Sequence, residues 1–231
     1  MFSRIRAFVT VVQFVITVLM TIVLMYTFKK HHRTIRKKWA RMQHYLMGFN
    51  IVEKGTFNPE AKLMLINHQS LVDIVAMESI HPMDPCWVTK KELQDIPLFG
   101  HIVRAPDMIP IDRSDRRSLI KLLVDVKDRL AKGRIIALFP EGTRGKGDKL
   151  LKFQSGAKVL AEKLDLKVQP IIITGSRYVL DSQKLTAHSG TVTVTYLDMI
   201  DPKKDENWYE TLKETMAKAL TDELANNPSH R

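Results

Sequence analysis

The sequence predicts an α/β fold, in which helices flank a mostly parallel sheet, preceded by an N-terminal membrane-embedded segment of two helices. Three observations lead to this prediction. From residue 60 onward, short β-rich runs alternate with stretches of helical spacing, the pattern of a parallel sheet covered by helices. Residues 7–28 carry no charge, and the basic excess lies within residues 1–50. We therefore expect membrane-anchoring helices in residues 1–50 and one α/β domain in residues 51–231.

Length and composition exclude several classes of protein. The chain has 231 residues, 45% hydrophobic and 26% charged, which is the mixture of a globular chain. Its single cysteine, Cys86, excludes a disulfide framework and a multi-cysteine metal site. A net charge of +11 could suggest nucleic acid. However, residues 1–50 hold nine Lys/Arg and no acidic residue, while the other 181 residues hold 27 basic and 25 acidic ones. We therefore expect no nucleic-acid partner and no metal site.

The first helix is predicted from the uncharged run Ala7–Phe28, which is 22 residues long. As a helix it would measure about 33 Å, close to the roughly 30 Å of a bilayer's hydrocarbon core. A secretory signal and a buried core helix are the alternatives. The run is too long for a signal's apolar region, and the basic KKHHR follows it instead of a cleavage site. We therefore expect this helix to associate with a membrane.

The second helix is predicted over residues 33–48. Ile35, Trp39, Met42 and Leu46 form one apolar stripe at helical spacing, with basic residues around it. Such a helix suits the headgroup layer of an anionic leaflet. The alternative is a solvated helix that packs Trp39 on the main domain.

The distribution of basic residues also bears on orientation. Seven Lys/Arg lie between residues 29 and 41, and two precede the apolar run. If the first helix spans the bilayer, this asymmetry places the main domain at the cytoplasmic face of the membrane. A two-helix hairpin embedded in one leaflet is the other possibility. The sequence places no constraint on the oligomeric state.

The main domain is predicted to contain six strands and four helices. The strands are the β-rich runs Lys62–Ile66, Cys86–Thr89, Met108–Ile111, Arg134–Phe139, Val168–Thr174 and Thr191–Leu197. The helices have the spacing of one apolar face, over Ser70–Ile80, Ser114–Lys132, Leu150–Leu164 and Glu206–Ala225. Ligands of such sheets bind beyond the carboxyl ends of the strands, so the loops at these ends are the first candidates for a site.

The loop after the first predicted strand contains His68, Ser70 and Asp73. Ser70 is suited to cap the following helix, and Asp73 completes a Ser-x-x-acidic capping box. This geometry also brings the Asp73 carboxylate towards the His68 imidazole. A carboxylate on one ring nitrogen raises the basicity of the other, which can then deprotonate a hydroxyl. From the residues alone, a catalytic pair and a purely structural cap are both open.

The loop after the Arg134–Phe139 run reads FPEGTRGKGDK, over residues 139–149. Its glycines allow close approach of the backbone to a ligand. Arg144 offers a planar fork of donors suited to phosphate, with Lys146 and Lys149 behind it. The alternative is a solvated basic turn. No P-loop, GxSxG or HExxH pattern occurs in the chain, so covalent serine chemistry and zinc chemistry are not supported.

Several blocks together resemble a known family. NHQSLVD, over residues 67–73, is followed about seventy residues later by FPEGTRG. Between and after them lie KKEL from Lys90 with Pro97, Phe99 and Gly100, then MIPIDR (108–113) and VQPI (168–171). In this order the blocks resemble the glycerolipid acyltransferases, specifically the 1-acylglycerol-3-phosphate acyltransferases, over roughly residues 60–175.

This resemblance implies a membrane-bound acyltransferase with an α/β acyltransferase domain. It would move a fatty acyl group from an acyl thioester to the sn-2 hydroxyl of lysophosphatidic acid, giving phosphatidic acid without an acyl-enzyme. His68 would be the general base and Asp73 would orient it. The co-substrate would be acyl-CoA or acyl-carrier protein, with no cofactor. The partners would be these substrates and the lipid bilayer.

The resemblance also implies a substrate-binding set. Arg144 with Glu141, Gly142 and Thr143 would hold the acceptor phosphate, while Arg113 and Lys90 would add positive charge there. Pro170 would shape the acyl end of the site. The same chemistry on glycerol 3-phosphate or another lysolipid is an alternative, as is a non-enzymatic, membrane-anchored lipid-binding protein.

Three positions depart from the family's pattern. Asp107 stands where the second motif usually begins with Gly, and Pro110 interrupts the hydrophobic run that follows. We expect the Asp107 carboxylate to point away from the phosphate. Gln154 stands at a position where the family often has Lys. That phosphate contact is then missing or supplied by Lys152 or Lys149.

Overall fold

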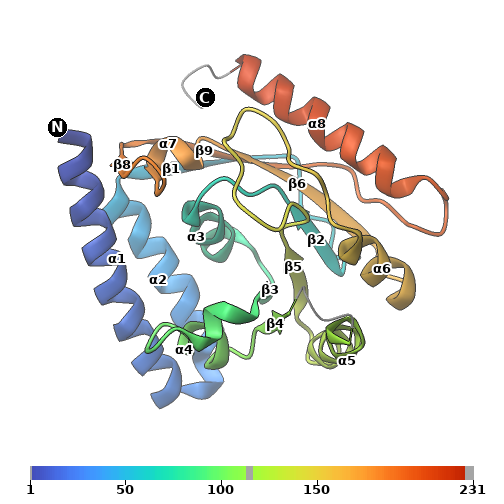
Figure 1. Ribbon diagram of the computed structural model, residues 1–231, viewed down its shortest axis with the longest axis horizontal. Coiled ribbons are helices and arrows are strands. Elements are labelled where there is room, and N and C mark those ends of the chain that lie inside the picture. The colour runs from blue at the N-terminus through green and yellow to red at the C-terminus, as the bar shows by residue number, and fades with distance from the viewer. Residues whose placement is uncertain (1, 113–116, 227–231) are drawn as a thin grey trace.

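The computed structural model describes residues 2–112 and 117–226, and its centre is a seven-stranded sheet (Figure 1). The strand order is β1-β9-β6-β2-β5-β3-β4. In chain order the strands are β1 (Phe49–Lys54), β2 (Leu63–Ile66), β3 (Pro85–Lys90), β4 (Ile109–Ile111), β5 (Ile135–Leu138), β6 (Val168–Thr174) and β9 (Gly190–Tyr196). A small separate hairpin is made of β7 (Leu180–Asp181) and β8 (Thr186–Ala187).

The sheet is mostly parallel, which confirms the predicted fold class. Strands β6, β2, β5, β3 and β4 pair in parallel, β9 runs antiparallel to β6, and β1 is parallel to β9. The central strands β2, β5 and β6 are buried along their whole length. Their continuous apolar sequences reflect this, because helices cover both faces of a parallel sheet.

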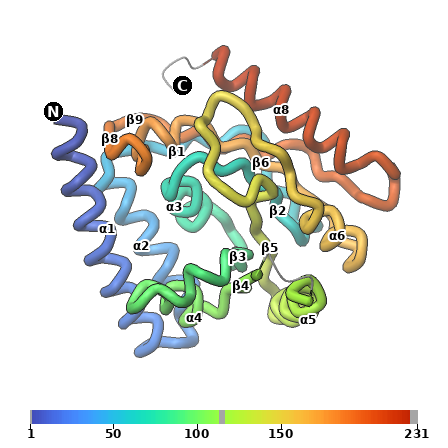
Figure 2. The backbone as a smooth tube through the Cα atoms, viewed as in Figure 1, coloured from blue at the N-terminus to red at the C-terminus, as the bar shows by residue number. Residues whose placement is uncertain are grey.

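Helices form a layer on each face of the sheet. On one side α3 (Leu71–Ile80), α2 (His32–Met47) and α1 (Phe2–Thr27) follow one another outward, and on the other lie α5 (Ser118–Ala131), α6 (Ser155–Leu164) and α8 (Trp208–Asn226) (Figure 1). Short helical turns connect them: η1 (Lys29–His31), η2 (Lys91–Asp95), α4 (His101–Arg104) and α7 (Ser176–Val179). The tube in Figure 2 shows the chain passing from the α1–α2 hairpin into the sheet.

Each of the six predicted strands begins and ends within one residue of an observed strand. Strand β1 was not predicted, and the expected boundary between residues 50 and 51 falls inside it. The helix expected over Leu150–Leu164 begins only at Ser155, because Leu151 N–H donates to Glu141 Oε2 and Gln154 N–H donates to the carbonyl of Pro140. The helix expected from Ser114 begins at Ser118 among the described residues.

Helix α1 is apolar and only partly covered by the rest of the protein. Among the described residues it is the one helix long and apolar enough to cross a membrane, with 28% of its most apolar stretch buried. Core helices and signal sequences have the same length and composition, so this is weak evidence for membrane association. Its outer face exposes large apolar side chains, among them Phe2, Phe8, Ile16, Met20 and Val23.

Helix α2 lies between α1 and α3 and contacts both (Figure 1). Trp39 packs edge-on against Phe14 of α1 at 5.3 Å and donates its indole N–H to Thr17 Oγ1 at 3.2 Å. Arg36 is 3% exposed and forms ion pairs with Glu78 and Asp84. The interpretation of α2 as a headgroup helix is therefore corrected for Arg36, which pairs with Glu78 inside the protein because a buried carboxylate needs a basic partner. Trp39 is half-buried against α1.

Candidate active site

A cavity of about 680 Å³ lies at the carboxyl ends of the parallel strands. His68 reaches it from the loop after β2, Lys90 from the end of β3, and Gly142, Thr143 and Arg144 from the loop after β5. Parallel strands place these ends at one edge of the sheet, which is why loops distant in sequence share one cavity. Arg113 lies outside the described residues.

His68 and Asp73 form a direct pair beside this cavity. His68 Nδ1 lies 2.8 Å from Asp73 Oδ2, and Asp73 is fully buried. The same carboxylate oxygen accepts the backbone N–H groups of Gln69 and Ser70 at 2.7 and 2.8 Å. The capping box at the start of α3 is also formed, with Ser70 as its N-cap residue. Asp73 is therefore both a helix cap and the partner of the imidazole.

The contact with Asp73 also determines which ring nitrogen faces the cavity. A carboxylate only accepts hydrogen bonds, so Nδ1 carries the proton that it donates to Asp73. The other nitrogen, Nε2, is then the one with a free lone pair. His68 lines the cavity, and no hydrogen bond from Nε2 reaches any of the described residues. This arrangement is suited to accepting a proton from a ligand.

The loop after β5 holds the backbone of His68 on both sides. Glu141 Oε1 accepts the N–H of His68 at 2.8 Å, and the N–H of Gly145 donates to the carbonyl of His68 at 2.7 Å. The second oxygen of Glu141 accepts the N–H of Leu151 at 2.7 Å. Burial raises the pKa of Glu141, although these two backbone donors oppose the shift.

Glu141 thus has a different position from the one expected of an acceptor-binding residue. Its side chain is buried, does not line the cavity, and directs both oxygens at backbone amides. A carboxylate facing the acceptor would also repel a phosphate. Its contacts fix the two loops that carry His68 and Arg144.

The neighbouring residues of the same loop face the cavity and carry its positive charge. Gly142 has a φ of 72°, a left-handed conformation that favours glycine. It turns the chain so that Thr143 and Arg144 line the cavity. Arg144 Nη1 donates to Ser182 Oγ at 2.8 Å, which steadies the guanidinium from the β7–β8 hairpin. Lys90, at the end of β3, is exposed and also lines the cavity.

The plane of the His68 ring is covered by an aromatic side chain. Phe139 stacks on His68 with centroids 3.8 Å apart and an interplanar angle of 11°. Trp87 stacks on the same phenyl ring at 5.3 Å and 20°. No spacing in the sequence singles out these two residues, because β3 and β5 are far apart along the chain and adjacent in the sheet.

Apolar side chains form most of the remaining walls. They come from α3, β3, η2, β4, β5 and α5, and include Ile74, Val88, Leu93, Ile111, Leu119, Leu122 and Leu138. A polar end and apolar walls in one cavity suit an amphiphilic ligand. Within the described residues, no group of three or more His, Cys, Asp or Glu could hold a metal ion. Burial raises the pKa of Cys86 to about 11, so its thiol is a poor nucleophile at neutral pH.

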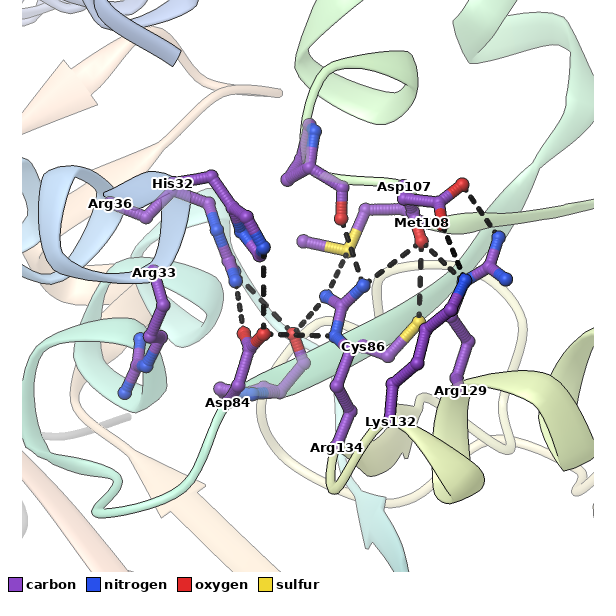
Figure 3. A network of polar contacts seen from close by, with 12 residues as sticks. His32, Arg33, Arg36, Asp84, Cys86, Asp107, Met108, Arg129, Lys132 and Arg134 are labelled. Atoms are coloured by element: carbon purple, nitrogen blue, oxygen red, sulfur yellow. Dashed lines mark hydrogen bonds and ion pairs between the residues drawn. The ribbon is translucent and has the colours of Figure 1, made fainter. Parts of the chain in front are cut away.

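The three departures from the family's pattern have structural explanations. Asp107 has a φ of 58°, a conformation that glycine adopts most readily. Its carboxylate pairs with Arg129 and Lys132 outside the cavity (Figure 3), so it points away as expected. Pro110 lies in β4, an edge strand, where proline is tolerated. Gln154 lines the cavity, whereas Lys149 and Lys152 do not.

The chain is similar in sequence to known acyltransferases. The family model described as Acyltransferase matches residues 49–174. A Helicobacter pylori protein named 1-acyl-sn-glycerol-3-phosphate acyltransferase is 42% identical over 175 residues, which is 75% of this chain and 74% of that protein. A Rhizobium meliloti protein named lyso-ornithine lipid O-acyltransferase is 31% identical over 127 residues, 54% of this chain and 43% of that protein.

A solved structure shares the fold. The crystal structure of the 1-acyl-sn-glycerophosphate acyltransferase PlsC from Thermotoga maritima superposes with a TM-score of 0.77 and covers 95% of each chain, at 19% sequence identity. The likeness extends through the N-terminal helices as well as the sheet. Together with the family match and the identity to the Helicobacter pylori protein, it confirms the resemblance drawn from the motifs: the chain belongs to the 1-acyl-sn-glycerol-3-phosphate acyltransferase family.

Proposed function

We propose that this protein transfers a fatty acyl group from an acyl thioester to the sn-2 hydroxyl of lysophosphatidic acid, giving phosphatidic acid. The observation that carries the proposal is the placement of the His68–Asp73 pair and of Arg144 on one cavity with apolar walls. The name of the Helicobacter pylori relative supports the acceptor.

In the proposed reaction His68 acts as a general base. Its Nε2 takes the proton of the acceptor hydroxyl, and the oxygen attacks the thioester carbonyl carbon. The new C–O ester bond forms and the C–S bond breaks. The proton held on the imidazole then passes to the leaving thiolate. Asp73 keeps the ring in the required tautomer and stabilises the imidazolium that forms between the two steps.

The acceptor's phosphate would bind at the Gly142–Arg144 turn. The guanidinium of Arg144 has donors besides the one bound to Ser182, and a guanidinium matches the geometry of a phosphate. Lys90 would add positive charge from the end of β3. Anchoring the phosphate there would hold the hydroxyl near His68, and this orientation is a large part of the rate gain in such reactions.

The fatty chains would lie along the apolar walls, and α1 would hold the domain on the membrane. The exposed apolar face of α1 supports this placement, and the excess of basic residues after it favours the cytoplasmic face. Acyl-CoA and acyl-carrier protein both present the required thioester. The reaction needs no cofactor, because the thioester is already activated.

The decisive experiment is an acceptor–donor panel with the purified full-length protein and mass-spectrometric identification of the products. We expect phosphatidic acid from lysophosphatidic acid with at least one thioester donor. The His68→Ala variant should lose roughly 10²–10⁴-fold in turnover while it still binds vesicles. A variant that turns over like the wild type would reject the mechanism and favour a lipid-binding protein.

A second acceptor deserves a place in the same panel. The Rhizobium meliloti relative is named for a different acceptor, lyso-ornithine lipid. This lipid carries no phosphate monoester. The cationic turn of residues 142–144 favours a phosphate acceptor. Faster acylation of lyso-ornithine lipid or of glycerol 3-phosphate than of lysophosphatidic acid would replace the proposed acceptor.

A further inference from the structure

We propose that Phe139 is a positioning residue for His68, and that Trp87 and Glu78 tie its ring to the N-terminal helix α2. The inference rests on the proposed function, because it concerns the orientation of the base. It adds a group of residues to which no role in the reaction has been assigned above.

The contact with Asp73 fixes one nitrogen of His68 but allows the ring to tilt about that contact. Phe139 covers one face of the ring nearly in parallel, 3.8 Å away by centroid. A flat surface at this distance blocks tilting towards it, and the direction of the Nε2 lone pair depends on that tilt. Misplacement of a reacting group by about 1 Å can lower the rate of a reaction roughly 10²-fold.

Trp87 holds the ring of Phe139 in place. Trp87 stacks on the face of Phe139 at 5.3 Å and is only 4% exposed. Its strand β3 pairs with β5, the strand that ends just before Phe139, with Trp87 opposite Ala137. The indole N–H of Trp87 donates to Glu78 Oε1 at 2.8 Å. The indole therefore cannot turn in its plane without breaking this buried hydrogen bond.

Basic residues of α2 anchor the carboxylate of Glu78. This carboxylate is 3% exposed at the end of α3 and pairs with Arg33, at 2.7 Å, and with Arg36 of α2. Arg36 also pairs with Asp84, which in turn lies 3.0 Å from Arg134 Nε (Figure 3). A buried charge of this kind moves only with its partners. The stack on His68 is thus fixed to the helix that packs against α1.

The alternative is that Phe139 merely fills space. A control is available, because Phe57 contacts a different histidine, His81, at the other end of α3, although edge-on rather than stacked (centroids 4.5 Å apart, interplanar angle 70°). Neither Phe57 nor His81 lines the cavity. Phe57→Leu removes a half-buried ring from a histidine just as Phe139→Leu does, but without any contact with His68.

The test compares these variants in the same full-length protein. Phe139→Leu is expected to lower kcat roughly 10- to 100-fold, with KM for acceptor and donor changed by less than about threefold. Phe139→Tyr keeps the ring and should retain most of the turnover. Phe57→Leu should lose stability without losing kcat. The proposal is overturned if Phe139→Leu keeps the wild-type kcat, or if the kcat of Phe139→Tyr falls as far as that of Phe139→Leu.

A spectroscopic readout keeps the proposal testable apart from turnover. In protein labelled at histidine, the His68 ring protons should be shifted upfield by the stacked phenyl ring, and should move downfield in Phe139→Leu. Trp87→Phe, which keeps a ring but lacks the indole N–H, should move the same signals partway and lower kcat several-fold.

If the His68 signals do not change in Phe139→Leu, the positioning role of Phe139 is rejected, while the proposed function is unaffected. Wild-type protein that makes no phosphatidic acid would reject the proposed function, whatever the spectra show.

Discussion

Glu141 accepts the backbone N–H of His68 at 2.8 Å, so a loop that follows β5 holds in place the residue that follows β2. The same carboxylate accepts the N–H of Leu151 at 2.7 Å. The two strands that carry these loops are adjacent in the sheet. One shared carboxylate therefore holds together the loop that carries His68 and the loop that carries Arg144.

Replacement of Glu141 by Gln should separate a structural role from an acceptor-binding one. Gln offers one oxygen acceptor and places an N–H₂ against the second backbone donor, so one buried N–H loses its partner. We expect a loss of about 1–3 kcal/mol in the free energy of unfolding and a lower kcat, with KM for the acceptor nearly unchanged. The measurements are chemical denaturation and steady-state kinetics.

Glu162→Gln on α6 is the matched control, since Glu162 is exposed, lies 3.8 Å from Lys158, and accepts the indole N–H of Trp208 at 3.2 Å through an oxygen that Gln retains. It should leave stability and kinetics as they are. A selective rise in the acceptor's KM for Glu141→Gln would restore the acceptor-binding role and contradict the present assignment.

Asp73 and Ser70 allow the catalytic and the capping contributions to be told apart. Asp73→Asn keeps an oxygen acceptor but removes the negative charge that orients His68 and stabilises its imidazolium, and should lower kcat by roughly 10²–10⁴-fold. Ser70→Ala removes the N-cap acceptor of α3 and the hydrogen bond that the hydroxyl donates to the Leu180 carbonyl at 2.7 Å, and should lower stability by about 1–3 kcal/mol with little effect on kcat. Equal kinetic losses in the two variants would mean that Asp73 acts only through the helix.

The sequence contains enough information for the sheet and for the His68–Asp73 pair. Buried parallel strands are continuous apolar runs, and a capping box has a fixed local spacing, so both can be read from neighbouring residues. The inward turn of Glu141 and the stack of Phe139 on His68 could not be predicted. They depend on contacts between loops about seventy residues apart, for which no local pattern exists.

The second helix shows the same limit for charged residues. Arg36 belongs to a run of basic residues that resembles a headgroup-binding face, and only the fold brings it to Glu78, 42 residues away. Local composition gives the charge of a segment but not its partner. A basic amphipathic pattern is thus compatible both with a membrane surface and with a buried ion pair.

Removal of Arg36 should destabilise the protein strongly. Arg36→Met leaves Glu78 and Asp84 buried with fewer positive partners, which typically lowers the free energy of unfolding by about 3–5 kcal/mol. Arg41→Met, an exposed change on the same helix, should alter stability by less than about 0.5 kcal/mol. Similar unfolding midpoints for the two variants in urea would show that the buried network contributes little.

Arg144 tests the proposed anion-binding end of the cavity. If its guanidinium holds the acceptor phosphate, Arg144→Ala should raise KM for lysophosphatidic acid about tenfold or more, since a charge-assisted contact is worth about 1.5–3 kcal/mol. KM for the thioester donor should change much less. Lys146→Ala removes a nearby exposed charge that does not line the cavity and should leave both values close to those of the wild type. A rise confined to the donor would move Arg144 to the donor site.

Stability at acid pH should depend on His81, which lies fully buried at the end of α3. Burial lowers its pKa from 6.5 to about 4, partly offset by the hydrogen bond from the Met83 N–H, while the charges of Arg33 and Lys37 add to the shift. The unfolded chain therefore binds a proton at a pH where the folded chain does not. The contribution of His81 to the free energy of unfolding is therefore fully present above pH 6.5. It falls as the pH is lowered towards 4, by up to about 1.4 kcal/mol per pH unit. Between pH 6.5 and 4, the free energy of unfolding, measured by denaturant titration, should fall less in His81→Leu than in the wild type. The exposed His31→Leu change should leave the dependence of this free energy on pH as in the wild type. An equal slope in all three proteins would mean that His81 does not contribute to acid sensitivity.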